Sequence, residues 1–116
     1  MNTNIESLSL NILDCLNEAN IDYSNLNDKE QIVAEKTMGK IKETMSETLA
    51  LIALSVINKS TKEQIEMIIG TNTTLLNGDV ILSSYKLEDK SYKTMREEFS
   101  RIIDEVEKIL KDTFLK

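Results

Sequence analysis

A short basic and aromatic segment holds the side chains of this chain that are best suited to binding. The set comprises Tyr85, Lys86, Tyr92, Lys93 and Arg96. On a helix, Tyr92 and Arg96 share one face, one turn apart, and Lys93 stands beside them. Such a patch can grip an anionic ligand or serve as an interface hot spot, where Tyr and Arg are enriched. The patch also fits ordinary surface, with Tyr92 at the edge of the core and with Lys93 and Arg96 in water.

Catalytic chemistry has little support in the sequence. There is no histidine, which removes the commonest general base and the commonest metal ligand. The single cysteine, Cys15, lies on an apolar helical stripe, which favours a packed thiol over a nucleophile. The glycines, Gly39, Gly70 and Gly78, are too widely spaced for a phosphate-binding loop. We therefore expect a protein that is not an enzyme and that needs neither a cofactor nor a metal.

The net charge of −6, from 20 acidic and 14 basic residues, limits the classes of partner. It disfavours nucleic acid and anionic membranes, both of which are bound through Lys and Arg. A neutral or cationic protein is the better electrostatic match, although a charge of this size also simply keeps a small protein soluble. If the basic patch is ordinary surface, the acidic face of Glu97, Asp104 and Glu105 is the next candidate for binding.

Targeting signals are not apparent in the sequence. Residues 1–6 lack the basic region followed by an apolar run that is typical of a signal peptide. The longest apolar stretch, Leu49–Ile57, has nine residues, whereas a membrane-spanning helix needs about 20. We expect a cytoplasmic protein.

The apolar periodicity predicts helices along most of the chain. A first helix begins at Ile5 and carries a stripe that Leu13 widens; the stripe consists of Leu8, Ile12, Cys15, Leu16 and Ala19. Asn27 and Glu30 have the spacing of a capping box and start a second helix, 28–58. Its first half carries one apolar face: Ile32, Ala34, Met38, Ile41 and Met45. Gly39 predicts a bend in this helix.

The second half of that helix is apolar around its whole circumference, which predicts burial on every side. In a chain of 116 residues this indicates contact with another subunit, most simply in a two-fold homodimer. The predicted oligomer interface consists of Leu49, Leu51, Ile52, Leu54 and Val56.

The region from 60 to 84 predicts a corner and then a change of structure. Ser60 and Glu63 resemble a second capping box, which starts a short helix that ends at Gly70. Asn77 and Gly78 lie between β-tolerant runs, so residues 72–84 are expected to form a small β-hairpin. A loop with a tight turn is the alternative.

The final helix has the strongest pattern. Its stripe consists of Tyr92, Met95, Phe99, Ile102, Val106, Ile109 and Thr113, widened by Ile103, Leu110 and Phe114. Residues 1–116 are therefore expected to form a single, mainly α domain. Two helices of this length overshoot a compact globule, so we expect an elongated helical hairpin or bundle with short extra helices.

The functional expectation is a small protein-binding module that sequesters or inhibits another protein, as immunity proteins, antitoxins, secretion chaperones and phage anti-defence proteins do. These classes of protein are compared with the chain through their size, helical content and charge, and not through a specific site. The alternative is a helical oligomer that binds a small anionic ligand, such as a signalling nucleotide, between its subunits through Tyr92, Lys93 and Arg96.

Overall fold

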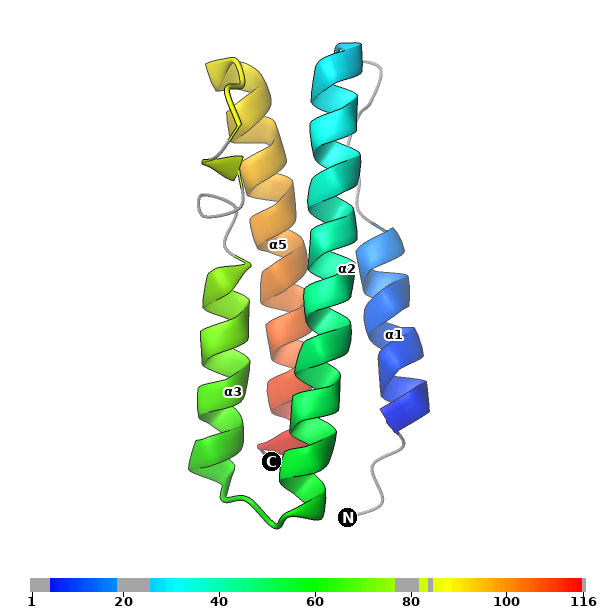
Figure 1. The fold of residues 1–116 in the computed structure, drawn as a ribbon, viewed down its shortest axis with the longest axis vertical. Helices are drawn as coiled ribbons and strands as arrows, with labels where there is room; N and C mark the ends of the chain where they lie inside the picture. The colour runs from blue at the N-terminus through cyan, green and yellow to red at the C-terminus, as the bar shows by residue number, and fades with distance from the viewer. Residues whose placement is uncertain (1–4, 19–25, 77–81, 84, 116) are drawn as a thin grey trace.

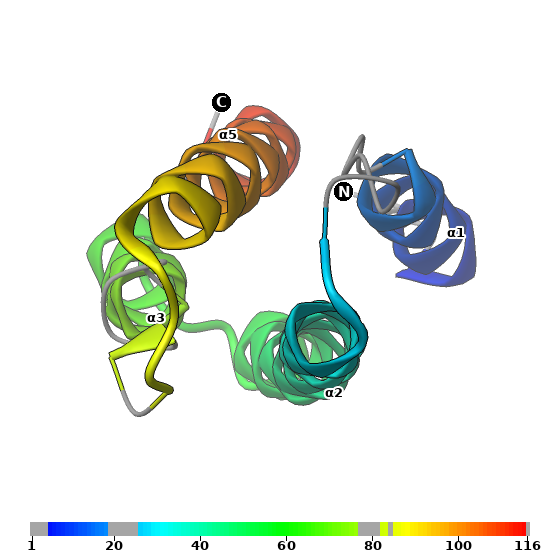
Figure 2. The same cartoon turned by 90° about the horizontal axis from the view of Figure 1, so that it is seen from above.

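The computed structural model describes residues 5–18, 26–76, 82–83 and 85–115. In this part of the chain, four helices form an up-down-up-down bundle (Figure 1). They are α1 (Ile5–Asn17), α2 (Asp28–Ile57), α3 (Lys62–Leu75) and α5 (Asp89–Phe114). Seen from above, the helices stand at the corners of a four-sided arrangement, in which α1 and α3 separate α2 from α5 (Figure 2). The mainly α fold predicted from the sequence is confirmed.

The bundle is elongated, as the helix lengths predicted. It measures 47 × 23 × 19 Å with a radius of gyration of 15.2 Å, against about 13 Å for a compact domain of this length. The two long helices, however, do not pack on each other as a simple hairpin. They lie across the diagonal of the bundle, and the shorter α1 and α3 fill the two remaining corners (Figures 1 and 2).

The core follows the helical periodicity of the sequence. In α5 the buried side chains include Met95, Phe99, Ile102, Val106 and Leu110. In α1, Leu8, Ile12, Cys15 and Leu16 are buried, as the predicted stripe requires. Two apolar side chains are displaced from the predicted faces: Ile32 is 52% exposed and Leu13 is 41% exposed. Val33 and Thr37 occupy the inner face of α2 instead.

The capping box that starts α2 is confirmed. The Asn27 side chain accepts a hydrogen bond of 2.8 Å from the backbone N–H of Glu30, and the Glu30 carboxylate accepts one of 3.0 Å from the backbone N–H of Asn27. Two hydrogen bonds hold the pKa of Glu30 below its ordinary value. The larger effect comes from the Ser91 hydroxyl and the smaller from the Asn27 backbone N–H. Hydrogen bonds to the charged form stabilise that form, which explains the direction of the shift.

Acidification should therefore weaken the fold partly through Glu30. Because the folded chain binds this proton less readily than the unfolded chain, the contribution is present above the ordinary pKa of 4.5 and is lost as the pH falls below it. Glu30→Gln keeps an oxygen that can accept the cap hydrogen bond but has no titrating proton. Thermal melts from neutral pH down to about pH 3 should show a larger loss of Tm in the wild type than in Glu30→Gln. Parallel curves for the two proteins would contradict this role.

The second capping box is displaced by one residue from the prediction. Thr61, not Ser60, caps α3: its hydroxyl accepts from the Gln64 backbone N–H at 3.2 Å, and the Gln64 side chain accepts from the Thr61 backbone N–H at 2.8 Å. Ser60 instead belongs to the end of α2, because its N–H bonds to the carbonyl of Ser55 at 2.9 Å. Lys59, just before Ser60, has a φ of 55°. This is the left-handed conformation that ends many helices.

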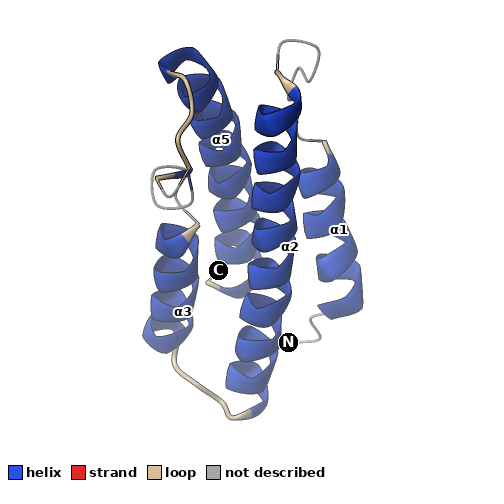
Figure 3. Ribbon diagram, turned by 45° about the horizontal axis from the view of Figure 1, so that its top comes forward, coloured by secondary structure: helices blue, strands red, loops and turns tan. Residues whose placement is uncertain are grey.

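The predicted β-hairpin of residues 72–84 is not supported. The helix α3 does not end at Gly70 but continues to Leu75, and Leu82 is helical and fully buried. The threonines fit a helix because their hydroxyls bond back to carbonyls one turn earlier, Thr73 to Ile69 and Thr74 to Gly70. No strand occurs among the described residues (Figure 3). The turn predicted at Asn77 and Gly78 lies outside the described residues.

Candidate functional site

The structure places the basic and aromatic patch around the first turns of α5. Tyr85 and Tyr92 are half-buried and pack against the core, while Lys86 and Lys93 are exposed. Arg96 is half-buried and already interacts within the chain, as does Tyr92. The two rings therefore pack against the core, and Lys86 and Lys93 are the exposed side chains of the patch.

The predicted oligomer residues divide into two groups. Leu49 and Ile52 are 6% and 0% exposed and face the core of their own chain, so they cannot reach a second subunit. Leu51, Leu54 and Val56 are 47%, 57% and 37% exposed. The segment Leu49–Ile57 is thus not buried on every side within one chain, and its outer face is apolar surface.

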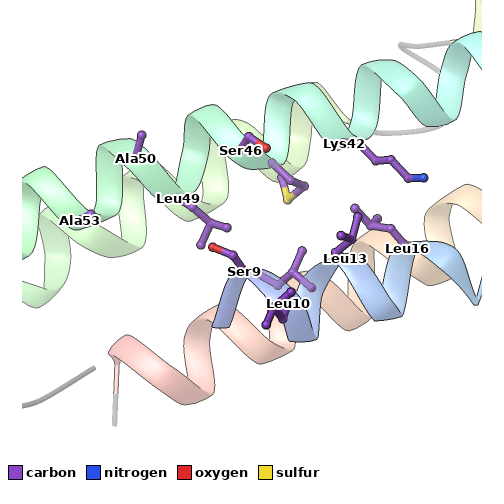
Figure 4. A pocket seen from close by; sticks show the side chains of 11 residues that line it. Ser9, Leu10, Leu13, Leu16, Lys42, Ser46, Leu49, Ala50 and Ala53 are labelled. Carbon is purple, nitrogen blue, oxygen red and sulfur yellow. The ribbon is translucent and has the colours of Figure 1, made fainter. Parts of the chain in front are cut away.

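An apolar groove between α1 and α2 adjoins this surface and was not predicted from the sequence. It has a volume of about 400 Å³. Leu10 and Leu13 form its α1 rim and are 56% and 41% exposed. Figure 4 shows Leu10, Leu13 and Leu16 of α1 across from α2, whose Leu49 points toward them. Among the described residues that line the groove, Lys42 alone carries a charge.

The groove exists because α2 presents small side chains where it passes α1. Ser46, Ala50 and Ala53 recur at intervals of four and three residues, which places them on one face of the helix. They do not fill the space beside Leu10 and Leu13, so a hollow remains. The signal in the sequence was this small-residue spacing within an apolar segment, together with leucines that α1 carries outside its buried stripe.

A second hollow, between α1 and α5, is acidic and contains Cys15. The thiol donates a hydrogen bond of 3.3 Å to the Glu105 carboxylate. Burial first, and this bond second, raise the pKa of Cys15 to about 11. Arg101 forms ion pairs with Glu98 at 2.6 Å and with Glu105 at 3.3 Å. The thiol is therefore held in its protonated form, which is a poor nucleophile, and Glu105 already has partners within the chain.

The described part of the chain offers neither a metal site nor a membrane-spanning helix. Over the described ranges there is no group of three or more acidic or thiol side chains placed to hold a metal ion. Nor does any helix there have the length and apolar character needed to cross a membrane. No protein-family model matches the chain, and neither a curated protein nor a solved structure shows significant similarity to it.

Proposed function

We propose that this chain is a non-catalytic protein-binding module that sequesters or inhibits another protein. The docking surface is the groove between α1 and α2, and its occupant is an amphipathic helix of the partner. The observation that carries the proposal is the exposure of the two leucines on the α1 rim of the groove. Leu10 and Leu13 are 56% and 41% exposed although both side chains are apolar.

The energetics favour a helix as the occupant. Burial of an exposed leucine contributes about 1.5–3 kcal/mol, so two half-exposed leucines offer a useful but modest gain that a partner's own apolar side chains would enlarge. A small-molecule site needs several polar groups that orient the ligand, whereas this groove offers Lys42 and two serines, Ser9 and Ser46. An open, aliphatic channel between two helices suits the apolar face of a third helix.

The alternative ligand, a small anion held by Tyr92, Lys93 and Arg96, has weaker support. Arg96 already interacts within the chain, and Tyr92 packs against the core. We propose the cytoplasm as its compartment.

The test compares three variants in affinity capture from the native host. Leu13→Asp places a charge on the groove rim, Met67→Asp places the same charge at a 70% exposed site on α3, and the third variant replaces Lys93 and Arg96 by Ala. We expect one protein to be retained by the wild type, by Met67→Asp and by the Lys93/Arg96 variant, but lost from Leu13→Asp. All four proteins should have the same far-UV circular dichroism, because the altered side chains lie outside the core.

Two results would overturn the proposal. Retention of the partner by Leu13→Asp would remove the groove as the docking surface. Loss of the partner only from the Lys93/Arg96 variant would move the site to the basic patch.

A further inference from the structure

We infer that the groove between α1 and α2 binds a free long-chain carboxylate, that is, a fatty acid. The carboxylate lies at Lys42 and the alkyl chain runs along the groove toward Ala53. Figure 4 shows Lys42 at one end of the lining side chains and Ala53 at the other. Such a ligand goes beyond the proposed function, because it competes with the partner helix for the same surface.

Lys42 differs from the other lysines that the structure describes. It is half-buried, whereas the others are exposed. No acidic residue stands three or four positions from it on α2, where the neighbours are Met38, Gly39, Met45 and Ser46. Within the described ranges, no side chain forms an ion pair with Lys42. This half-buried lysine therefore carries a charge without a counter-charge, which a ligand carboxylate can supply.

The acidic side chains of α1 and of the middle of α2 do not line the groove. Asp14 and Glu18 line the hollow on the α5 side of α1. Glu43 and Glu47 of α2 are exposed and are not part of the groove lining. The net charge of −6 opposes long-range attraction of an anion. Burial of the alkyl chain therefore has to supply most of the affinity, while Lys42 fixes the orientation.

The rest of the groove suits an alkyl chain. Its described lining is apolar apart from Lys42 and two serines, of which Ser9 already interacts within the chain. A compact small molecule needs several polar contacts to orient it, whereas an alkyl chain is oriented by the one contact at its carboxyl end. The volume of about 400 Å³ lies within the range of roughly 300–1,000 Å³ that is typical of ligand pockets.

The length of the groove selects the length of the alkyl chain. Lys42 and Ala53 are eleven residues apart on α2, which corresponds to about 16 Å of helix. An extended alkyl chain advances roughly 1.3 Å per carbon, because its bonds of about 1.5 Å follow a zigzag. A carboxylate of about twelve carbons therefore spans the groove from one end to the other.

The first measurement is titration calorimetry with octanoate, decanoate, dodecanoate and tetradecanoate, each below its micelle concentration. Each added methylene up to dodecanoate should raise the affinity about two- to fourfold. The gain from dodecanoate to tetradecanoate should be smaller, because the tail then leaves the groove. Dodecanoate should also raise the Tm, since it binds the folded chain. An affinity that does not depend on chain length, or a Tm that dodecanoate lowers, would overturn the inference.

The second measurement tests the orientation of the ligand. Lys42→Met should weaken binding of dodecanoate about fivefold and should not weaken binding of dodecanol, which carries no charge. Lys40→Met is the matched control, because it removes an exposed lysine from the same helix, and it should leave both affinities unchanged. Equal weakening of dodecanoate binding by the two variants, or weakening of dodecanol as large as that of dodecanoate in Lys42→Met, would contradict a carboxylate at Lys42.

Cosedimentation with phosphatidylglycerol vesicles separates a free carboxylate from a membrane surface. Binding to the vesicles without binding of dodecanoate would overturn the inference.

The ligand and the partner helix can fail separately. If dodecanoate does not bind but the partner is lost from Leu13→Asp, the binding module stands and the ligand site does not. If dodecanoate binds through Lys42 but Leu13→Asp still captures the partner, the ligand site stands and the partner docks elsewhere. When both hold, dodecanoate should release the captured partner.

Discussion

Ile52→Asp should leave the chain largely unfolded, whereas Leu51→Asp, one residue earlier, should leave the fold intact. Ile52 is 0% exposed and Leu51 is 47% exposed. An unpaired carboxylate in an aliphatic core costs several kcal/mol, beyond the lost packing of the isoleucine. A domain of this length has a total stability of only about 6–17 kcal/mol, so this one change consumes a large part of it.

Far-UV circular dichroism with thermal melting distinguishes the two variants. Leu51→Asp should keep the helical spectrum, with a Tm close to that of the wild type. Ile52→Asp should show a much reduced helical signal or a strongly lowered Tm. If both variants melted alike, the inner face of α2 would be assigned wrongly, and with it the division of the apolar segment into core and surface.

The helices could be predicted from the sequence wherever one strong period dominated. In α5 the apolar residues recur every three or four positions over seven turns, and Phe99, Ile102 and Val106 are fully buried as predicted. The start of α2 was also predictable, because a capping box involves only residues 27–30. In both places the local pattern and the tertiary packing agree.

Where two local patterns competed, the sequence alone was not decisive. Ser60/Glu63 and Thr61/Gln64 both fit a capping box, and the choice depends on how the chain leaves α2 through Lys59. The run of threonines before Leu75 has β propensity, yet its hydroxyls find acceptors within α3. Intrinsic β propensity is a weak guide where an existing helix supplies hydrogen-bond acceptors for the threonine hydroxyls.

The candidate site required the tertiary arrangement. The apolar segment of α2 was recognisable, but which of its sides faces its own chain depends on where α1 and α3 stand. That information separates Ile52 from Leu54 and reveals the hollow beside Leu13. The basic and aromatic patch was recognisable from its residue types, while the packing of Tyr92 against the core became visible only in the fold.

Replacing both mid-helix glycines by alanine should stabilise the protein by about 2 kcal/mol and raise its Tm by roughly 8 °C. Gly39 lies inside α2 and Gly70 inside α3, where glycine costs about 1 kcal/mol relative to alanine through the entropy of its unfolded backbone. An added Cβ would meet no atom within 4 Å at either site, so no steric penalty opposes the gain.

The single variant Gly70→Ala tests the corrected course of α3 most directly. If Gly70 ended the helix in the left-handed conformation that its sequence context suggested, alanine would lose stability there, because its Cβ disfavours that backbone. Inside a helix that continues to Leu75, the same change should gain stability. Thermal and urea unfolding of Gly70→Ala, with Gly39→Ala as the control for an unambiguous helix interior, should give increases of similar size. A decrease at position 70 beside an increase at position 39 would restore Gly70 as a helix end and reopen the structure of the residues that follow it.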